Sequence, residues 1–188
     1  MSLPAPPSRP APPASPARLA LPPLALSHIR RSLRREVGAL AATHVLHDAG
    51  FAAGEDIFEH FADRLPEEPV HLPAPSFWSA LSGHLEAEGW GHFEVERVHS
   101  GLGLVRAHGW AESNPEGEEE QPGCHFTSGM FAALLGRVAG GPVAVLEVLC
   151  RSKGDDHCGF LYGSEAAIHE IYGLLLDGAS LDDALAGL

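Results

Sequence analysis

Apolar residues in the first third of the chain recur three and four positions apart, as they do on one face of a helix. Ser27 stands before this pattern as a candidate N-cap, and Gly50 follows it. We therefore expect a first helix over residues 27–50 with its apolar face in the core. The residues of this face are Ile29, Leu33, Val37, Leu40, Val45 and Leu46.

Two shorter helices are predicted to follow. One starts near Gly54 and stops at Pro66, because proline cannot continue a helix interior. Phe58 and Phe61 lie on its inner face. Prolines at 69, 73 and 75 then predict a linker. The cap and inner face of the other helix are Ser76, Trp78, Leu81 and Leu85.

The period of the pattern changes from helical to alternating at Gly91. Phe93 and Val95 alternate with glutamates, and Ser100-Gly101 offers a turn. Residues 102–110 then return as a partner strand. This stretch predicts an antiparallel hairpin.

The C-terminal part of the chain predicts a second hairpin between helices. Residues 126–138 are apolar enough for a buried helix, and 142–150 and 158–162 read as two strands. Ser164 and Ser180 each stand where a helix can begin. The order of elements favours an α+β domain with helices packed on a four-stranded antiparallel sheet.

Composition separates a tail from this domain. Nine of the 16 prolines fall in the first 23 residues, which leaves too little apolar surface to offset the entropy of ordering. We expect residues 1–26 to be a disordered Pro/Ala-rich tail and residues 27–188 to form one domain. No apolar run is long enough to cross a bilayer and no secretion signal is evident, so a cytoplasmic protein is expected.

Charge argues against a nucleic acid partner. The formal net charge is −13, and an acidic surface repels phosphates. The basic stretch from Arg30 to Arg35 is interpreted as a solvated helix face in preference to a contact with an acidic partner or with the chain itself. Residues 111–122 are rich in glutamate, and we expect these acids, including Glu112, to be solvated in an exposed loop.

The three cysteines and one strand carboxylate suggest a metal site. They are Cys124, Glu147, Cys150 and Cys158. A buried carboxylate is costly unless it is paired or bound, and zinc accepts thiolate and carboxylate ligands in a tetrahedron. Residues three apart on a regular strand face opposite ways, so Glu147 and Cys150 can share an ion only if the strand bends or bulges. Spacing alone leaves two alternatives open: buried free thiols, or a Cys150–Cys158 disulfide with Glu147 paired to an arginine.

The residues around these positions resemble the closing motif of the 4-vinyl-reductase domain family. The motif segments are CHFTSG at 124–129, GR at 136–137, EVLC at 147–150 and KGDDHCGF at 153–160. The family includes aromatic-sensing domains of bacterial activators and hydrocarbon-binding proteins, and its fold is similar to that of transport-protein-particle (TRAPP) subunits. The resemblance therefore implies a TRAPP-like fold and a structural zinc ion on the three cysteines and Glu147.

The same resemblance implies an apolar ligand pocket between helices and sheet. Trp110 and His84 take the places of the polar pocket residues of the phenol sensors, while Phe93 and Phe126 are expected to supply apolar walls. We expect a non-catalytic sensor or carrier of a small hydrophobic or aromatic ligand, since no glycine-rich nucleotide loop or nucleophile elbow appears. The alternative is a TRAPP-like interaction module that acts as a homodimer and passes any signal to a protein partner.

Overall fold

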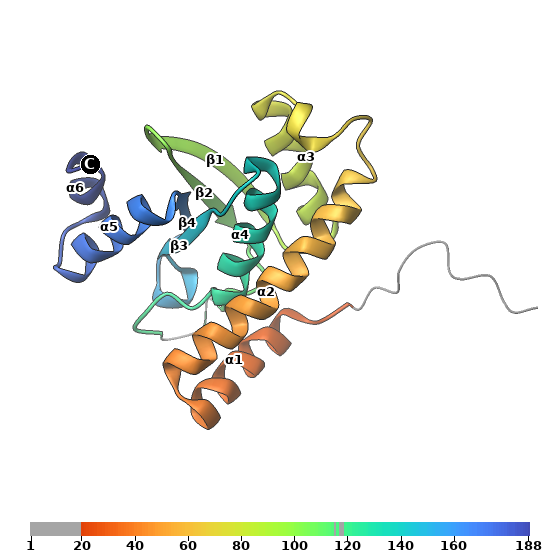
Figure 1. The fold of residues 1–188 in the computed structure, drawn as a ribbon. Coiled ribbons are helices and arrows are strands. Elements are labelled where there is room, and N and C mark those ends of the chain that lie inside the picture. Colours follow the sequence, from red (N-terminus) through yellow and green to blue (C-terminus); the bar gives the residue numbers. More distant parts are fainter. Residues whose placement is uncertain (1–19, 115, 117–118) are drawn as a thin grey trace, which may run out of the picture.

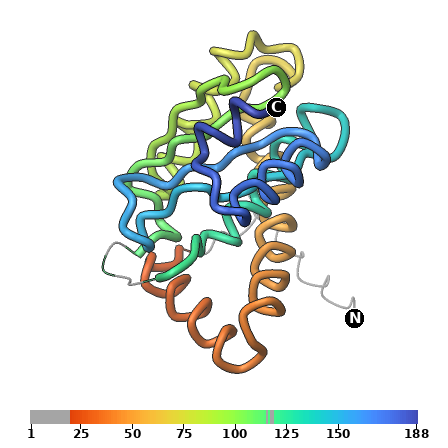
Figure 2. Tube along the Cα trace, turned by 90° about the vertical axis from the view of Figure 1, so that its left-hand side faces the viewer, coloured from red at the N-terminus to blue at the C-terminus, as the bar shows by residue number. Residues whose placement is uncertain are grey.

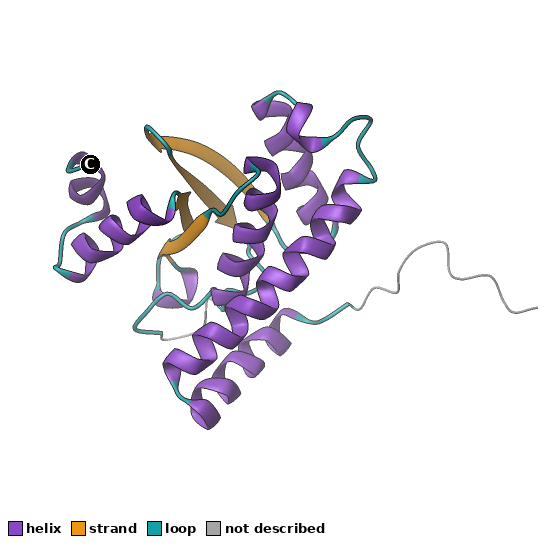
Figure 3. Ribbon diagram, viewed as in Figure 1, coloured by secondary structure: helices purple, strands orange, loops and turns teal. Residues whose placement is uncertain are grey.

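The computed structural model describes residues 20–114, 116 and 119–188. These residues form one antiparallel sheet with helices on both of its faces (Figure 1, Figure 3). Residues 1–19 of the expected tail lie outside the described part, and residues 23–26 belong to the first helix. The elements are α1 (Pro23–Val37), α2 (Ala39–Ala62), η1 (Pro69–His71), α3 (Ala74–Ala87), β1 (His92–His99), β2 (Leu102–His108), α4 (His125–Ala139), β3 (Ala144–Leu149), η2 (Arg151–Lys153), β4 (Cys158–Gly163), α5 (Glu165–Leu176) and α6 (Leu181–Ala186).

The four strands lie in the order β1-β2-β4-β3, and each neighbouring pair is antiparallel. Both hairpins predicted from the sequence are present, and β2 joins them by pairing with β4. The predicted α+β class with a four-stranded antiparallel sheet is therefore confirmed. The predicted caps of the last two helices are also confirmed, because Ser164 and Ser180 accept hydrogen bonds from Ala167 N–H and Asp183 N–H.

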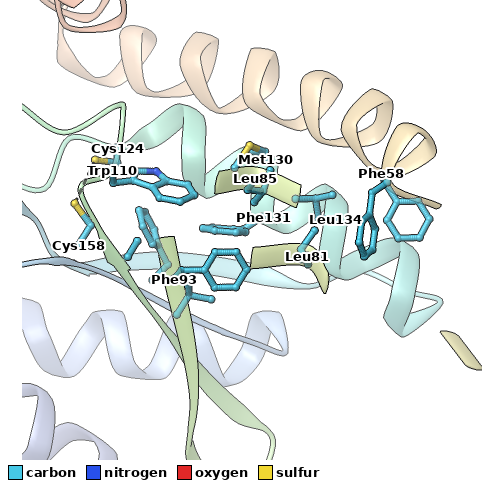
Figure 4. Close-up of a cluster of buried hydrophobic side chains, with 14 of the residues drawn as sticks. Phe58, Leu81, Leu85, Phe93, Trp110, Cys124, Met130, Phe131, Leu134 and Cys158 are labelled. Carbon is cyan, nitrogen blue, oxygen red and sulfur yellow. Dashed lines mark hydrogen bonds between the residues drawn. The ribbon is translucent and has the colours of Figure 1, made fainter. Parts of the chain in front are cut away.

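The two faces of the sheet belong to two apolar clusters. On one face, Phe93, Val105 and Phe160 pack with side chains of α2, α3 and α4. The other face carries Leu104 and Leu161 against α5 and α6. Figure 4 shows the first cluster, in which Trp110 and Phe131 lie close to the cysteines at one end.

The N-terminal helices differ from the prediction. Gly38, with φ of +85°, breaks the expected helix 27–50 into α1 and α2, and α2 continues through the predicted second helix. Ser27 is a buried residue within α1 and not its cap. Most of the apolar face expected in the core is exposed, with Leu40 at 72% and Val37 at 52%. Figure 2 shows α1 and the first half of α2 projecting as a hairpin from the rest of the molecule.

The buried face of α2 is its small-residue face. Ala42, Leu46, Gly50, Gly54 and Phe58 recur every four residues and pack on α4. A side chain at Gly50 would overlap the carbonyl oxygen of Phe126. The two backbones therefore lie too close for the bulky residues that marked the predicted face, which turn to solvent.

Candidate metal centre and ligand cavity

Four residues from three segments meet at one end of the sheet. Cys124 immediately precedes α4, Glu147 lies in β3, Cys150 directly follows β3, and Cys158 begins β4. All four are buried, and their candidate ligand atoms lie within 4.8 Å of one another. The Sγ atom of Cys124 is 4.0 Å from the Sγ atoms of both Cys150 and Cys158. The structure thus brings together the four residues that the sequence singled out.

An irregularity in β3 makes this convergence possible. Glu147 pairs with Phe160 and Leu149 with Gly159, so the register shifts between Glu147 and Leu149. The predicted bend of the strand between Glu147 and Cys150 is therefore confirmed. The connection back to β4 is closed by Asp155, whose Oδ2 accepts a hydrogen bond of 2.7 Å from the Cys150 N–H.

The Glu147 carboxylate is only partly satisfied by the protein. Its Oε2 accepts a 2.7 Å hydrogen bond from the Cys124 N–H. Its Oε1 is buried without a hydrogen-bond partner among the described residues. Burial, together with the charge of Cys150, raises the pKa of Glu147 well above its ordinary value. No described arginine pairs with this carboxylate, so the arginine alternative is not what the structure contains.

The thiols fit a metal ion better than they fit a disulfide. All three are free cysteines. Hydrogen bonds with the other two thiols raise the pKa of Cys124 and lower that of Cys150, so in the metal-free cluster one thiolate is shared among three sulfurs. Four-coordinate zinc at ~2.3 Å from each sulfur would set neighbouring sulfurs about 3.8 Å apart. The observed 4.0 Å spacing and the unpartnered Glu147 oxygen fit such an ion.

A second buried carboxylate, Glu112, was not expected. It is 2% exposed, and it accepts hydrogen bonds from Phe126 N–H at 3.1 Å, Thr127 N–H at 2.7 Å and Thr127 Oγ1 at 2.6 Å. Trp110 Nε1–H donates to the same Thr127 hydroxyl at 2.8 Å. Burial raises the pKa of Glu112 to about 7 against these hydrogen bonds. The prediction that Glu112 is solvated is wrong: this carboxylate caps α4.

The basic stretch of α1 is also not simply solvated. Arg30 is 2% exposed, and its guanidinium donates to the Gly123 carbonyl at 3.0 Å and to Glu119 at 3.2 Å. Arg34 bonds the other Glu119 oxygen at 2.6 Å. The interpretation as a solvated face is therefore wrong for Arg30, which binds the loop just before Cys124. Burial and these two arginines lower the pKa of the neighbouring His125.

Three of the four predicted pocket residues lie in one aromatic cluster. Trp110 is 1% exposed, and its ring centroid lies 6.4 Å from that of Phe93 and 5.6 Å from that of Phe131. Phe126 stacks on Trp90, which in turn packs on Trp110. The indole N–H of Trp110 is already bonded to Thr127. The fourth predicted residue, His84, is on α3, where its ring lies 5.5 Å from that of Phe61.

An apolar cavity of about 250 Å³ opens between η1, α3, the end of α4 and β4. None of the four predicted pocket residues lines it. Phe77 and Trp78 form part of its wall, and Tyr162 of β4 contributes from the sheet. The lining residues are Pro69, Val70, Leu72, Ala74, Phe77, Trp78, Leu135, Val138, Ala139, Val143 and Tyr162.

The segment that carries the candidate metal ligands matches a known family. Residues 111–164 match the family model of the 4-vinyl-reductase domain. This segment belongs to the 4-vinyl-reductase family. It contains Glu112 and all four residues of the cysteine–glutamate cluster, and the resemblance noted in the sequence is confirmed. No match was found among the curated proteins.

Solved structures share the fold of this 4-vinyl-reductase-family chain. The phenol-responsive sensory domain of the transcription activator PoxR, solved with phenol, has 16% identity and a TM-score of 0.60, covering 78% of this chain and 76% of that domain. Subunit 3 of a trafficking protein particle complex from Naegleria fowleri, covalently bound to palmitic acid, has 11% identity and a TM-score of 0.55, covering 75% and 91%. A vinyl-4-reductase family protein from Methanocaldococcus jannaschii has 17% identity and a TM-score of 0.49, covering 74% and 75%. The TRAPP-like fold is confirmed.

None of the helices in the described part of the chain combines the length and the apolar character needed to span a membrane.

Proposed function

We propose that this chain is a non-catalytic domain that binds a small hydrophobic or aromatic molecule. The observation that carries the proposal is the apolar cavity between η1, α3, α4 and β4. An apolar cavity of about 150 Å³ suffices to bind benzene, so about 250 Å³ accommodates one substituted ring. Two proteins with this fold support the proposal, since one was solved with phenol and the other with palmitic acid.

The cavity wall supports binding over catalysis. Its side chains are aliphatic or aromatic, and they include no carboxylate, imidazole, thiol or amine. General acid–base and nucleophilic catalysis draw on those groups. Ligand pockets of carrier and sensor proteins, in contrast, are mostly apolar with a few polar groups that fix orientation.

We further propose that zinc occupies the cluster of three cysteines and Glu147 and acts as a structural ion. Four protein ligands complete a tetrahedron and leave no position for a reacting water. The ion would neutralise the buried thiolates and satisfy the second oxygen of Glu147. Because the ligands come from the start of α4 and both strands of the β3–β4 hairpin, zinc would join the helix to the sheet.

The ligand proposal is tested by filling the cavity. Ala74, in the first turn of α3, lines it, and Ala74→Phe should reduce the affinity for small aromatics by about tenfold or more in calorimetric titrations. Ala166→Phe is a matched control, since Ala166 is an exposed residue in the first turn of α5 and does not line the cavity. Equal affinity of both variants for every aromatic that the unsubstituted chain binds would place the site elsewhere. Failure of the unsubstituted chain to bind any of them would refute the proposal.

A second candidate function is that of a homodimeric interaction module. The observation that favours it is the row of exposed apolar side chains on the α1–α2 hairpin. Monomeric proteins seldom expose large contiguous apolar patches, and a self-complementary patch is what a two-fold dimer needs. The members of this row are Leu24, Ile29, Val37, Leu40 and Val45, each at least 44% exposed.

A further inference from the structure

The cavity differs from the other described cavities in its charge. One groove between α3 and β1 is lined by Glu86, Glu94 and His92. Another, between α2 and α4, is lined by Glu55 and Arg137. The cavity proposed above has no charged side chain in its wall. A ligand carboxylate or phosphate buried there would lose its hydration without a partner, which is costly.

Among the lining side chains, hydrogen-bonding groups are limited to the Tyr162 hydroxyl and the Trp78 indole N–H. The Tyr162 ring packs at 5.8 Å from that of Trp78. It also lies across Gly103, its partner on β2, where any side chain would overlap the ring atoms near the hydroxyl. The missing side chain at Gly103 therefore leaves the room that the Tyr162 ring occupies.

The Tyr162 side chain is half-buried, and its hydroxyl forms no hydrogen bond with the described residues. Burial raises the pKa of Tyr162 above its ordinary value, so the hydroxyl keeps its proton at neutral pH. A neutral phenol group can both donate and accept a hydrogen bond. A partly buried hydroxyl without a protein partner favours a bound molecule that supplies one.

We infer that this cavity takes a neutral, predominantly apolar molecule with one hydrogen-bonding group, and that the Tyr162 hydroxyl selects for that group. The inference rests on the proposed ligand-binding function and specifies its ligand class and specificity-determining residue. It places recognition at the β4 wall of the cavity, away from His84 and Trp110. If Tyr162 acted only as an apolar wall, removing its hydroxyl would leave the order of affinities unchanged.

The test compares three probes of similar size: 4-ethylphenol, ethylbenzene and 4-ethylbenzoate. We expect the unsubstituted chain to bind 4-ethylphenol about 3- to 10-fold more tightly than ethylbenzene, the range of one net hydrogen bond. The anion 4-ethylbenzoate should bind at least about tenfold more weakly than 4-ethylphenol, because its charge would be buried without a partner. In Tyr162→Phe the preference for 4-ethylphenol over ethylbenzene should disappear.

Tyr172→Phe is the matched control, because Tyr172 is exposed on α5 and outside the cavity. It should keep the full preference, and thermal unfolding of both variants verifies that they are folded. A Tyr162→Phe protein that still prefers 4-ethylphenol would overturn the inference, as would tight binding of 4-ethylbenzoate. In both of those cases ligand binding itself would stand. Absence of binding by all three probes would instead refute the proposed function together with the inference.

Discussion

Glu147 is the residue whose environment most requires a cation. One of its oxygens is bonded to the Cys124 N–H, while the other is buried without a hydrogen bond from the described residues. An ion bound there would satisfy the free oxygen and hold three thiolates at once. Glu147 was recognisable in the sequence because it interrupts an apolar strand among the cysteines.

Loss of one ligand should therefore cost both metal and stability. We expect about one zinc per chain after purification without added metal, and less than about half of that in Cys158→Ser. Structural zinc contributes directly to folding, so a loss of about 3 kcal/mol or more should lower the unfolding midpoint by roughly 10 °C. Elemental analysis and thermal unfolding measure the two effects.

Glu147→Gln should behave like Cys158→Ser, although more mildly, because an amide oxygen is a weaker zinc ligand than a carboxylate. Glu94→Gln, at an exposed position of β1, is the control and should keep both zinc and midpoint. A metal-free protein that is as stable as the zinc-loaded protein would contradict a structural role.

Glu112 gives the fold a pH dependence of a definite sign. Its pKa is about 7 in the folded chain against 4.5 for an ordinary glutamate. The folded state therefore holds a proton that the unfolded state has already lost, so this residue's contribution is full below pH 4.5 and is lost as the pH rises through 7. The difference is at most about 3 kcal/mol, at about 1.36 kcal/mol per pK unit.

The comparison with Glu112→Gln isolates this effect, because both proteins carry the same cluster of cysteines. From about pH 5 to about pH 8, urea unfolding should show the unsubstituted chain losing about 1–3 kcal/mol more stability than Glu112→Gln. Glu116→Gln, at an exposed position in the same loop, should follow the unsubstituted chain. Parallel pH profiles for Glu112→Gln and Glu116→Gln would mean that Glu112 does not titrate in this range.

At the scale of elements, the close approach of α2 to α4 predicts opposite effects at two helical glycines. Gly50→Ala should destabilise the fold by about 2–4 kcal/mol, because the new methyl group meets the Phe126 carbonyl and overpacking displaces backbone. Gly83→Ala in α3 meets nothing within 4 Å and should stabilise by about 0.5–1 kcal/mol. Urea denaturation measures both. A neutral Gly50→Ala would show that the two helices can separate at little cost.

The same contact explains why the N-terminal helices were harder to predict than the sheet. Strands and their turns follow from alternation and from Ser100-Gly101, and both depend on local sequence. The buried face of α2 depends on a distant partner: Gly50 and Gly54 are in the core because α4 is there, and no local pattern shows it. Arg30 is a similar case, since its burial follows from contact with Gly123 and Glu119, which are far away in the sequence.

The candidate site divides along the same line. The four metal ligands were predicted because three cysteines and a misplaced acid are visible in the sequence without any knowledge of packing. Glu112 was missed because its partners, Phe126 and Thr127, belong to a helix that starts only after the whole glutamate-rich loop. One clue was available: α4 begins after Cys124, which provides no side-chain cap. A helix start without a local cap calls for a distant acceptor.

At the scale of the whole molecule, the exposed face of the α1–α2 hairpin is the feature that the described chain does not use. Its side chains alternate with the small-residue face that packs on α4, so the hairpin has two apolar faces and only one partner within the described chain. Burial of the second face against a second copy would remove Leu40 and its neighbours from water. A gain of about 25 cal/mol per Å² applies to this surface.

Charge placed in that face should therefore break the dimer. In light scattering coupled to gel filtration, we expect the unsubstituted chain to have twice the monomer mass, and Leu40→Glu to have the monomer mass with an unchanged circular dichroism spectrum. Leu176→Glu is the matched control, because Leu176 is 68% exposed on α5, against 72% for Leu40, and lies in a different element. It should remain dimeric. A monomeric mass for the unsubstituted chain at high micromolar concentration would exclude the hairpin as a self-association surface, and dissociation by Leu176→Glu alone would move the interface to α5.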